Sequence, residues 1–222
     1  MNQKAVALIS GGMDSAVAAA LTKEQGKQIY AISFDYGQRH RIELDAAKKV
    51  AARLEAIEHK IVRVELEALG GSALTDRTQI RKNGLAPEIP ATYVPARNIV
   101  FLAIALAWAE TIQAGTIVIG ANAVDFSGYP DCRQEFMEAF QKTAETGTKA
   151  GKQGRAPMIC APLMNMKKAE IVKQGMRLGV DFGITTSCYD PEPKGKPCGK
   201  CDACRLRAKG FAEANCKDPL SR

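Results

Sequence analysis

The chain has 222 residues, of which 46% are hydrophobic, so it is long enough to bury the core of one sizeable α/β domain. Its most apolar stretch, around Ile99–Trp108, is too short to span a membrane and is followed by Glu110. The formal net charge of +7 suits polyanionic ligands, among them nucleotides and nucleic acids. Because the first apolar run starts almost at Met1, we expect no signal peptide, and we predict a cytoplasmic protein with no membrane partner.

Apolar runs alternate with helical patterns through the first two thirds of the chain. In chain order we predict a strand at 5–9, a helix at 14–25, a strand at 28–34, a helix at 42–54, a strand at 60–66, a helix at 98–113, a strand at 116–120, a helix at 131–145, a strand at 158–161, and a helix that Asn165 caps and that runs to about Leu178. Repeated β-α units favour a doubly wound α/β fold, in which helices cover both faces of a parallel sheet. Residues 70–90 lack clear periodicity, which is typical of a mobile flap.

The first strand leads directly into the run Ser10-Gly11-Gly12-Met13-Asp14-Ser15. Glycines let the backbone approach an anion closely, and the free N–H groups and the dipole of a helix N-terminus attract negative charge. Ser10 and Ser15 add hydroxyl donors. The run therefore predicts a phosphate-binding loop, although it lacks the Gly-Lys-Ser/Thr ending of a P-loop and the spacing of a dinucleotide fingerprint. A glycine turn that merely caps a helix is the alternative.

The C-terminal part of the chain holds four closely spaced cysteines: Cys188, Cys198, Cys201 and Cys204. Gly199 permits a tight turn among them, and thiolates around such a turn suit a tetrahedral zinc ion. An iron–sulfur cluster is an alternative, but a bacterial ferredoxin places its fourth cysteine three residues later, before a proline. A redox-active Cys-x-x-Cys pair would leave two cysteines unexplained. We therefore favour structural zinc in a C-terminal segment, residues 185–222, that follows an α/β domain of residues 1–184.

Three further polar stretches lie beside predicted elements. Phe34-Asp35-Tyr36-Gly37-Gln38-Arg39-His40 follows the second strand, Tyr93-Val94-Pro95-Ala96-Arg97-Asn98 precedes the alanine-rich helix, and residues 120–133 follow the fourth strand. Each alone is explained by a capped turn, with Asn98 and Asp131 as N-caps. Because ligands of such sheets bind at the carboxyl ends of strands, the three together favour a binding site beside the phosphate loop.

The phosphate loop resembles the pyrophosphate loop, S-G-G-x-D-S, of the PP-loop ATP pyrophosphatases, which transfer AMP to a carbonyl or carboxyl oxygen. With F-D-Y-G-Q-R-H, P-A-R-N, G-A-N-x-x-D-x-S-G-Y-P-D-C-R and C-G-K-C-x-x-C, the chain is similar to the 7-cyano-7-deazaguanine synthase family from about Ala5 to Cys204. The resemblance implies a sheet of the PP-loop type, zinc on the four cysteines, and a homodimer. It also implies that ATP and ammonia convert 7-carboxy-7-deazaguanine into the nitrile 7-cyano-7-deazaguanine (preQ0), a precursor of queuosine in tRNA.

The resemblance and the residue types together assign candidate roles. ATP, with Mg²⁺ bridging its phosphates, is expected at Leu8, Ile9, Ser10, Gly11, Gly12, Met13, Asp14, Ser15, Ala16, Val17 and Ala18. Asp14, Arg97 and Lys167 are the catalytic candidates; for Arg97 and Lys167, which would neutralise phosphate charge, a surface salt bridge and a helix-start lysine are the alternatives. Substrate binding is expected at Phe34, Tyr36, Asn122, Asp125, Tyr129, Asp131 and Arg133, with Asp131 accepting from the guanine-like edge and Tyr129 or Phe34 stacking on the ring.

Two adenylations make the implied reaction possible. The first turns the carboxylate into an acyl-AMP that ammonia attacks, and the second activates the resulting amide so that AMP leaves and the nitrile forms. No Cys-His arrangement of a glutaminase is evident, so ammonia is expected to arrive free.

A tRNA-thiolating PP-loop enzyme is an alternative, but it needs a reactive cysteine outside the metal site and an RNA-binding module. A zinc-bearing nucleic-acid-binding module is another, and it leaves the loop unexplained. We expect no stable nucleic-acid partner.

Overall fold

The computed structural model describes residues 3–38, 42–74, 89, 92–124, 129–192 and 195–221. Within these residues, five strands form one parallel sheet in the order β3-β2-β1-β4-β5. The strands are β1 (Lys4–Leu8), β2 (Gln28–Asp35), β3 (Glu58–Arg63), β4 (Thr116–Val118) and β5 (Met158–Cys160). The chain moves from β1 outward to β3 and then returns to the other side of β1, so the strand order reverses between β1 and β4.

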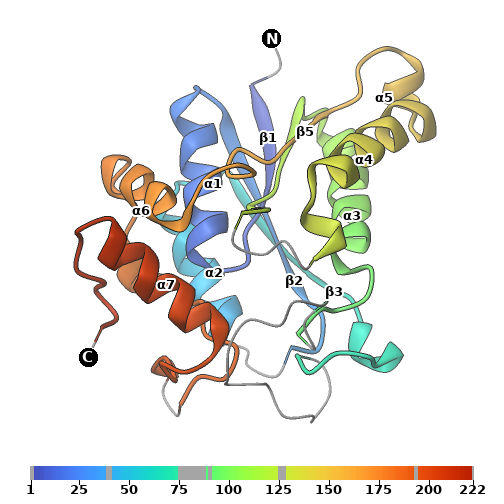
Figure 1. Ribbon diagram of the computed structural model, residues 1–222. Coiled ribbons are helices and arrows are strands. Elements are labelled where there is room, and N and C mark those ends of the chain that lie inside the picture. Colours follow the sequence, from blue (N-terminus) through green and yellow to red (C-terminus); the bar gives the residue numbers. More distant parts are fainter. Residues whose placement is uncertain are drawn as a thin grey trace.

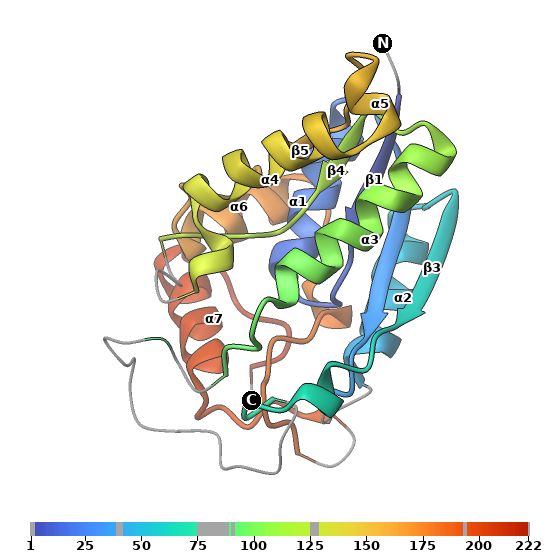
Figure 2. The same ribbon diagram turned by 90° about the vertical axis from the view of Figure 1, so that its right-hand side faces the viewer.

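Helices cover both faces of this sheet (Figures 1 and 2). They are α1 (Met13–Glu24), α2 (Ile42–Arg53), α3 (Arg97–Ile112), α4 (Gln134–Gly147), α5 (Lys149–Lys152), α6 (Lys168–Arg177) and α7 (Asp202–Glu213), with 3-10 turns at Leu66–Leu69, Pro130–Cys132 and Phe182–Ile184. Successive residues of β1 face opposite core layers. Val6 and Leu8 pack with α3 and α4, whereas Ala5, Ala7 and Ile9 pack with α1, α2 and α6. The predicted doubly wound α/β fold is therefore confirmed.

The predicted elements are present, and most of their ends differ from the prediction by one to three residues. The strand predicted at 60–66 spans Glu58–Arg63, and the helix predicted at 131–145 starts at Gln134 because Pro130–Cys132 forms a separate 3-10 turn. The last predicted helix starts at Lys168 and not after Asn165, because the Glu170 carboxylate accepts the backbone N–H of Lys167, at 2.7 Å, and closes the first turn there. Most of the flap predicted at 70–90, and Asp125, lie outside the described residues.

Two glycines let neighbouring backbones meet at the loop after β1. Gly11 has φ +85°, and a Cβ on it would lie 2.4 Å from the carbonyl oxygen of Glu43 in α2. A Cβ on Gly120, just past β4, would lie 2.7 Å from the backbone nitrogen of Ser15. Both distances are shorter than any side-chain contact, so the loop, the start of α2 and the end of β4 come together only because these positions are glycine.

Among the residues described, no helix combines the length and the apolar character that a membrane crossing requires.

Candidate active site

A cavity opens at the carboxyl ends of β1, β2 and β4, beside the point where the strand order reverses. Segments far apart in the sequence form its walls: the loop after β1, the residues after β2, the starts of α2, α3 and α6, and the C-terminal segment with α7. Figure 1 shows α7, in red, beside α6 near the lower ends of the strands. The phosphate loop and the three polar stretches meet at one sheet edge as predicted, and the C-terminal segment joins them there.

The loop Ser10–Ser15 turns hydroxyl and backbone N–H groups towards one another and towards the cavity. The Oγ atoms of Ser10 and Ser15 are 3.1 Å apart, Gly12 N–H donates to Ser10 Oγ at 3.3 Å, and Ser15 Oγ donates to the Gly12 carbonyl at 3.0 Å. Gly12 is the N-cap of α1 and has no side chain with which to cap it. The N-terminus of α1 therefore has the arrangement that binds phosphate oxygens.

The eleven residues predicted to bind ATP divide into a cavity wall and a layer behind it. Leu8, Ile9, Ser10, Gly12, Met13, Asp14 and Ser15 line the cavity, whereas Gly11, Ala16, Val17 and Ala18 are buried and do not line it. The layer behind the wall sets the position of the loop, because it packs against the sheet and α2.

Lys168 reaches into the cavity from α6 and pairs with Asp14. Its Nζ lies 3.0 and 2.9 Å from the two carboxylate oxygens of Asp14, and the side chains are 6% and 26% exposed. Gly210 of α7 makes room for this lysine, because a Cβ there would lie 2.4 Å from Lys168 Cγ. The pair places a cation directly beside the phosphate loop.

The structure brings Lys168, and not the predicted Lys167, to this cavity. Lys167 is exposed and serves as the N-cap of α6. Neighbouring residues of a helix point about 100° apart, so only one of the two lysines can face the core. The pattern of α6 carries the missed signal: Lys168 precedes the buried Ile171 and Val172 by three and four residues, which places it on their face.

Arg97 supplies a second cation to the cavity, from the first turn of α3. Its Cζ lies over the ring of Tyr36, 5.8 Å from the centroid. Burial alone would lower the pKa of Arg97, but the surrounding groups, first Tyr36 and Cys132, raise it, so the guanidinium stays charged. Burial and then the nearby Glu43 carboxylate raise the pKa of Tyr36 to about 12, so the phenol keeps its proton.

Asp131 is engaged by the start of α3. Its Oδ2 accepts the backbone N–H of Asn98 at 3.1 Å, and Asn98 Nδ2 donates to the Asp131 carbonyl at 3.2 Å and to Cys132 Sγ at 3.3 Å. Neither N-cap alternative holds, because Ala96 is the N-cap of α3 and Arg133 that of α4. Asp131 instead caps α3 from another segment, and the predicted acceptor for a guanine-like edge is buried behind the cavity wall.

The aromatic candidates after β2 do face the cavity. Phe34 and Tyr36 both line it, and Phe34 stacks on Phe101 with ring centroids 4.0 Å apart and planes 7° from parallel. One wall of the cavity is therefore flat and aromatic, a surface suited to a planar ring.

The candidates that follow β4 lie around the cavity and not on its wall. Asn122 is buried and donates to the Leu163 carbonyl at 2.9 Å, Tyr129 is buried with its hydroxyl 2.7 Å from that of Thr92, and Arg133 is exposed. Within the described residues these side chains support the wall, and their substrate contacts stay a prediction.

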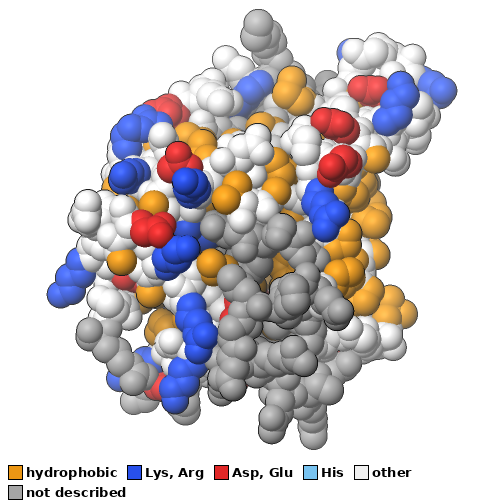
Figure 3. Space-filling model, viewed as in Figure 1, with side chains coloured by type: hydrophobic (Ala, Val, Ile, Leu, Met, Phe, Trp, Pro, Cys, Tyr) orange, Lys and Arg blue, Asp and Glu red, His pale blue; other side chains and the backbone are white. Residues whose placement is uncertain are grey.

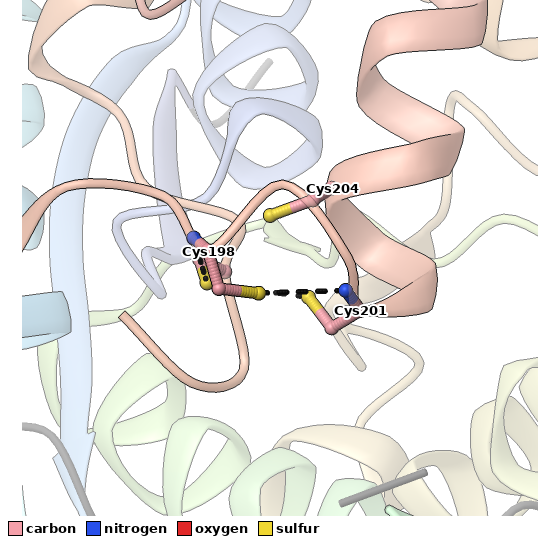
Figure 4. Close-up of side chains that lie close together, drawn as sticks. Cys198, Cys201 and Cys204 are labelled. Atoms are coloured by element: carbon pink, nitrogen blue, oxygen red, sulfur yellow. Dashed lines mark hydrogen bonds between the residues drawn. The ribbon is translucent and has the colours of Figure 1, made fainter. Parts of the chain in front are cut away.

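The four predicted metal ligands come together before and at the start of α7. The sulfur atoms of Cys188, Cys198, Cys201 and Cys204 all lie within 4.8 Å of one another, and Figure 4 shows three of them turned towards one point. Backbone N–H groups of Cys198 and Asp190 approach Cys188 Sγ at 3.3 and 3.4 Å. A tetrahedron with ~2.3 Å metal–sulfur bonds has edges of about 3.8 Å, so the cluster has the size of a single-ion site.

The cysteine cluster is connected to the cavity by the chain between Thr186 and Tyr189. Thr186 N–H donates to the Gly11 carbonyl at 2.9 Å, and Thr186, Ser187 and Tyr189 line the cavity next to Cys188. The sequence showed no role for these three residues. The segment predicted as a separate zinc-binding unit therefore forms one wall of the same cavity.

The rest of the C-terminal segment is held by Arg207 of α7. Its guanidinium donates to both carboxylate oxygens of Asp218 at 2.8 Å, to Thr185 Oγ1 at 2.8 Å and to the Phe182 carbonyl at 2.9 Å. The ion pair is almost fully buried, at 5% and 12% exposure. Because each nitrogen of the guanidinium has an acceptor, the buried pair holds α7 in place beside the cavity.

Comparison with known proteins identifies the family. A family model described as "Queuosine biosynthesis protein QueC" matches residues 4–215. A protein of Desulfatibacillum aliphaticivorans named "7-cyano-7-deazaguanine synthase" is 55% identical over 223 residues, which cover 98% of this chain and 95% of that protein. One of the same name from Pseudomonas paraeruginosa is 56% identical over 220 residues, which cover 99% and 98%. The chain belongs to the 7-cyano-7-deazaguanine synthase family.

Solved structures place this synthase family among PP-loop folds. NMN synthetase from Francisella tularensis superposes with a TM-score of 0.52 at 19% identity, over 97% of this chain and 79% of that chain. A 4-thiouridine synthetase solved with RNA and bound ATP gives a TM-score of 0.52 at 19% identity, over 95% and 53%. Likenesses at this identity show the fold alone, and they confirm the predicted PP-loop architecture.

Two matched substitutions separate the neighbouring lysines of this synthase. Lys168→Met removes the cation beside the phosphate loop and leaves Asp14 without its partner, so we expect ATP turnover to fall at least about tenfold. Lys167→Met removes an exposed charge from the adjacent position, and we expect turnover within about twofold of wild type. Steady-state AMP release measures both. An equal loss in the two variants, or a loss in Lys167→Met alone, would contradict this assignment.

Proposed function

We propose that this chain makes 7-cyano-7-deazaguanine from 7-carboxy-7-deazaguanine, ammonia and ATP, as a step of queuosine biosynthesis. One observation carries the proposal: in a chain of this family, a phosphate loop, two cations and an aromatic wall share a single cavity. The loop and the cations suit ATP, and the wall suits a flat heterocycle.

The chemistry starts from a carboxylate, which is a poor acceptor because its leaving group would be oxide. Attack of the carboxylate on the α-phosphate of ATP releases pyrophosphate and gives an acyl-AMP, from which ammonia displaces AMP to form the amide. The amide oxygen then attacks a second ATP, and departure of AMP leaves the nitrile. Both rounds activate an oxygen on the same carbon, so one cavity serves both.

The residues of the cavity divide this work between binding and charge stabilisation. The hydroxyls of Ser10 and Ser15 and the N-terminus of α1 hold the departing pyrophosphate. Lys168 and Arg97 neutralise the charge that develops on the phosphates. Phe34 and Tyr36 orient the heterocycle, with its carboxylate directed to the loop.

The carboxylate of Asp14 fits Mg²⁺ bound with ATP. It lies beside the phosphate loop, is partly exposed to the cavity, and offers the oxygen ligands that hard cations prefer. Bound there, the ion would offset phosphate charge. Lys168 keeps this carboxylate oriented towards the loop.

One assay tests the proposed function. The protein is mixed with ATP, Mg²⁺, ammonia and 7-carboxy-7-deazaguanine, and AMP and the product mass are followed by mass spectrometry. We expect AMP release to depend on the acid, with an amide that appears first and a nitrile that accumulates. AMP release that needs tRNA and no deazapurine would overturn the proposal in favour of thiolation.

Thiolation is disfavoured by the state of the cavity cysteine. Cys132 lines the cavity outside the metal cluster, but burial and then the Asp131 carboxylate raise its pKa to about 12. A thiol that keeps its proton at neutral pH is a poor sulfur nucleophile. The site therefore fits the proposed synthase better than a thiolating enzyme.

We infer that the metal of the cysteine cluster is zinc. Four sulfur ligands at the spacing of one tetrahedral ion suit Zn²⁺, and a four-thiolate site leaves no open position for chemistry. Such ligands stay reduced in the cytoplasm, where we expect the chain to act.

Removal of this metal is expected to weaken ATP binding as well as to loosen the C-terminal segment, because residues 186–189 are one wall of the cavity. Cys204→Ser should lose stoichiometric zinc, expose residues near 185–200 to limited proteolysis, and raise the Kd for ATP at least about tenfold, or ~1.4 kcal/mol. Cys216→Ser, outside the cluster, is the matched control. A zinc-free variant that binds ATP like wild type would contradict the coupling.

We also infer that two copies of the chain associate through the outer face of α3. Most exposed or half-exposed positions of this face are uncharged: Ile99, Val100, Ala103, Ile104, Ala107 and Thr111. The half-exposed Glu110 lies on the same face, and its carboxylate accepts the backbone N–H of Ala150 at 2.8 Å. Figure 2 shows α3 in front of the strands, beside α4, and Figure 3 shows hydrophobic side chains along the corresponding edge. Surface helices normally carry charge there. Because each copy carries a formal net charge of +7, self-association is favoured at a face that presents no Lys or Arg and few charges of any kind.

A charge at the centre of this face tests the dimer. Ala103→Glu is expected to convert a dimer into a monomer in light scattering, because two buried carboxylates would face each other across the two-fold axis. Ala52→Glu, at an exposed position of α2 on the opposite side of the sheet, should leave the dimer intact. A dimer that survives Ala103→Glu would exclude this face.

A further inference from the structure

Glu43 lines the cavity and has no role in the binding and charge stabilisation proposed above. It lies in the first turn of α2 and lines the cavity with the phosphate loop, Arg97 and Tyr36. Its backbone carbonyl lies against Gly11, where a Cβ would come within 2.4 Å. Glu43 is thus anchored to the loop that binds ATP.

The surroundings of Glu43 differ from those of Asp14 in the same cavity. Asp14 is held by Lys168 at 2.9 and 3.0 Å, whereas no side chain of the described residues hydrogen-bonds to the carboxylate of Glu43. Burial raises the pKa of Glu43 to about 7, against the lowering effect of Arg97. The pKa is raised although Glu43 lies in the first turn of α2, where the helix dipole favours the charged carboxylate.

Several titratable and charged groups line the cavity around Glu43. Tyr36 approaches from the end of β2 and Arg97 from α3, while Asp14 with Lys168, and Tyr189 of the C-terminal segment, line the cavity farther along. Tyr36 keeps its proton and Arg97 stays charged, as shown above by the raised pKa of each. The carboxylate of Glu43, with its pKa raised to about 7, is suited to gain and lose a proton near neutral pH.

The reaction needs such a group, because all three N–H bonds of ammonia must break before a nitrile forms. When ammonia attacks the acyl-AMP, a C–N bond forms, the C–O bond to AMP breaks, and nitrogen loses one proton. After the amide oxygen has attacked the α-phosphate and pyrophosphate has left, nitrogen loses a second proton to give an imidate adenylate. The C–O bond to AMP then breaks, the third proton leaves, and the C≡N bond is complete.

We propose that the Glu43 carboxylate is the general base that accepts these protons from nitrogen and passes them to solvent. The proposal rests on the proposed function, because it assigns the proton acceptor of that reaction. The other described candidates are engaged or unsuited. Asp14 is paired with Lys168, Asp131 is buried and holds the start of α3, and the pKa of the Cys132 thiol is raised to about 12.

The test uses Glu43→Gln and starts from the amide, so that the ionisation of ammonia does not enter the pH profile. In the wild type, nitrile formation from the amide and ATP should rise as pH passes through about 7, because the protonated carboxyl cannot accept a proton. In Glu43→Gln that rise should be absent and the plateau rate at least about a hundredfold lower. Glu43→Asp should keep the rise at a reduced rate.

Two controls separate a base from a structural role. Exchange of pyrophosphate into ATP in the presence of the acid measures adenylation, which breaks no N–H bond, and Glu43→Gln should retain it within about threefold of wild type. Asp45→Asn changes an exposed carboxylate in the same helix turn, which pairs with Lys48, and should leave rate and pH profile unchanged.

The outcomes distinguish this inference from the proposed function. Nitrile formation by Glu43→Gln at the wild-type rate, with the wild-type pH profile, overturns the role of Glu43 and leaves the synthase standing. Loss of pyrophosphate exchange in parallel with nitrile formation also overturns it, in favour of a role in ATP binding. A wild-type protein that forms no nitrile from the amide overturns both, since no N–H proton would then be released.

Discussion

The loop between β1 and α1 is held by backbone contacts too close to admit a side chain. Gly11 lies against the first turn of α2, Gly120 against the backbone of Ser15, and the Gly11 carbonyl accepts the N–H of Thr186. The same few atoms therefore position the phosphate loop, the helix that carries Glu43, and the C-terminal wall of the cavity. Because these backbones are in close contact, a shift of the phosphate loop would also move α2 and the C-terminal wall of the cavity.

Two carboxylates in the cavity are set apart by their surroundings. Asp14 is paired with a buried lysine beside the loop, a position that suits a carboxylate near phosphates and Mg²⁺. Glu43 is desolvated, and its pKa of about 7 suits a group that changes charge during turnover. The cavity thus offers separate groups for the two proposed tasks: Lys168 and Arg97 for phosphate charge, and Glu43 for the removal of protons from nitrogen.

The C-terminal segment belongs to this cavity although its composition differs from that of the sheet domain. A segment with few large apolar side chains gains its order from a metal and from a buried ion pair, here the cysteine cluster and Arg207 with Asp218. Two residues connect this segment to the cavity wall: Tyr189, next to Cys188, lines the cavity, and Thr186 donates its N–H to the Gly11 carbonyl. In this arrangement we expect metal binding and nucleotide binding to be coupled. The boundary predicted at residue 185 follows a change in composition, and residues on its C-terminal side line the cavity.

The amino-acid sequence alone determined the β-α order, the phosphate loop and the cysteine set, because each is a pattern of neighbouring residues: apolar runs, helical spacing, glycines after a strand, and closely spaced thiols. Folding decided which of two adjacent lysines meets Asp14, a residue 154 positions away in the chain. It also turned Asp131 into the cap of a helix that starts more than thirty residues earlier and placed Glu43 in the cavity. The reason is physical: periodicity shows which face of a helix is buried, but the partner that each buried polar group finds depends on segments that meet only in the folded chain.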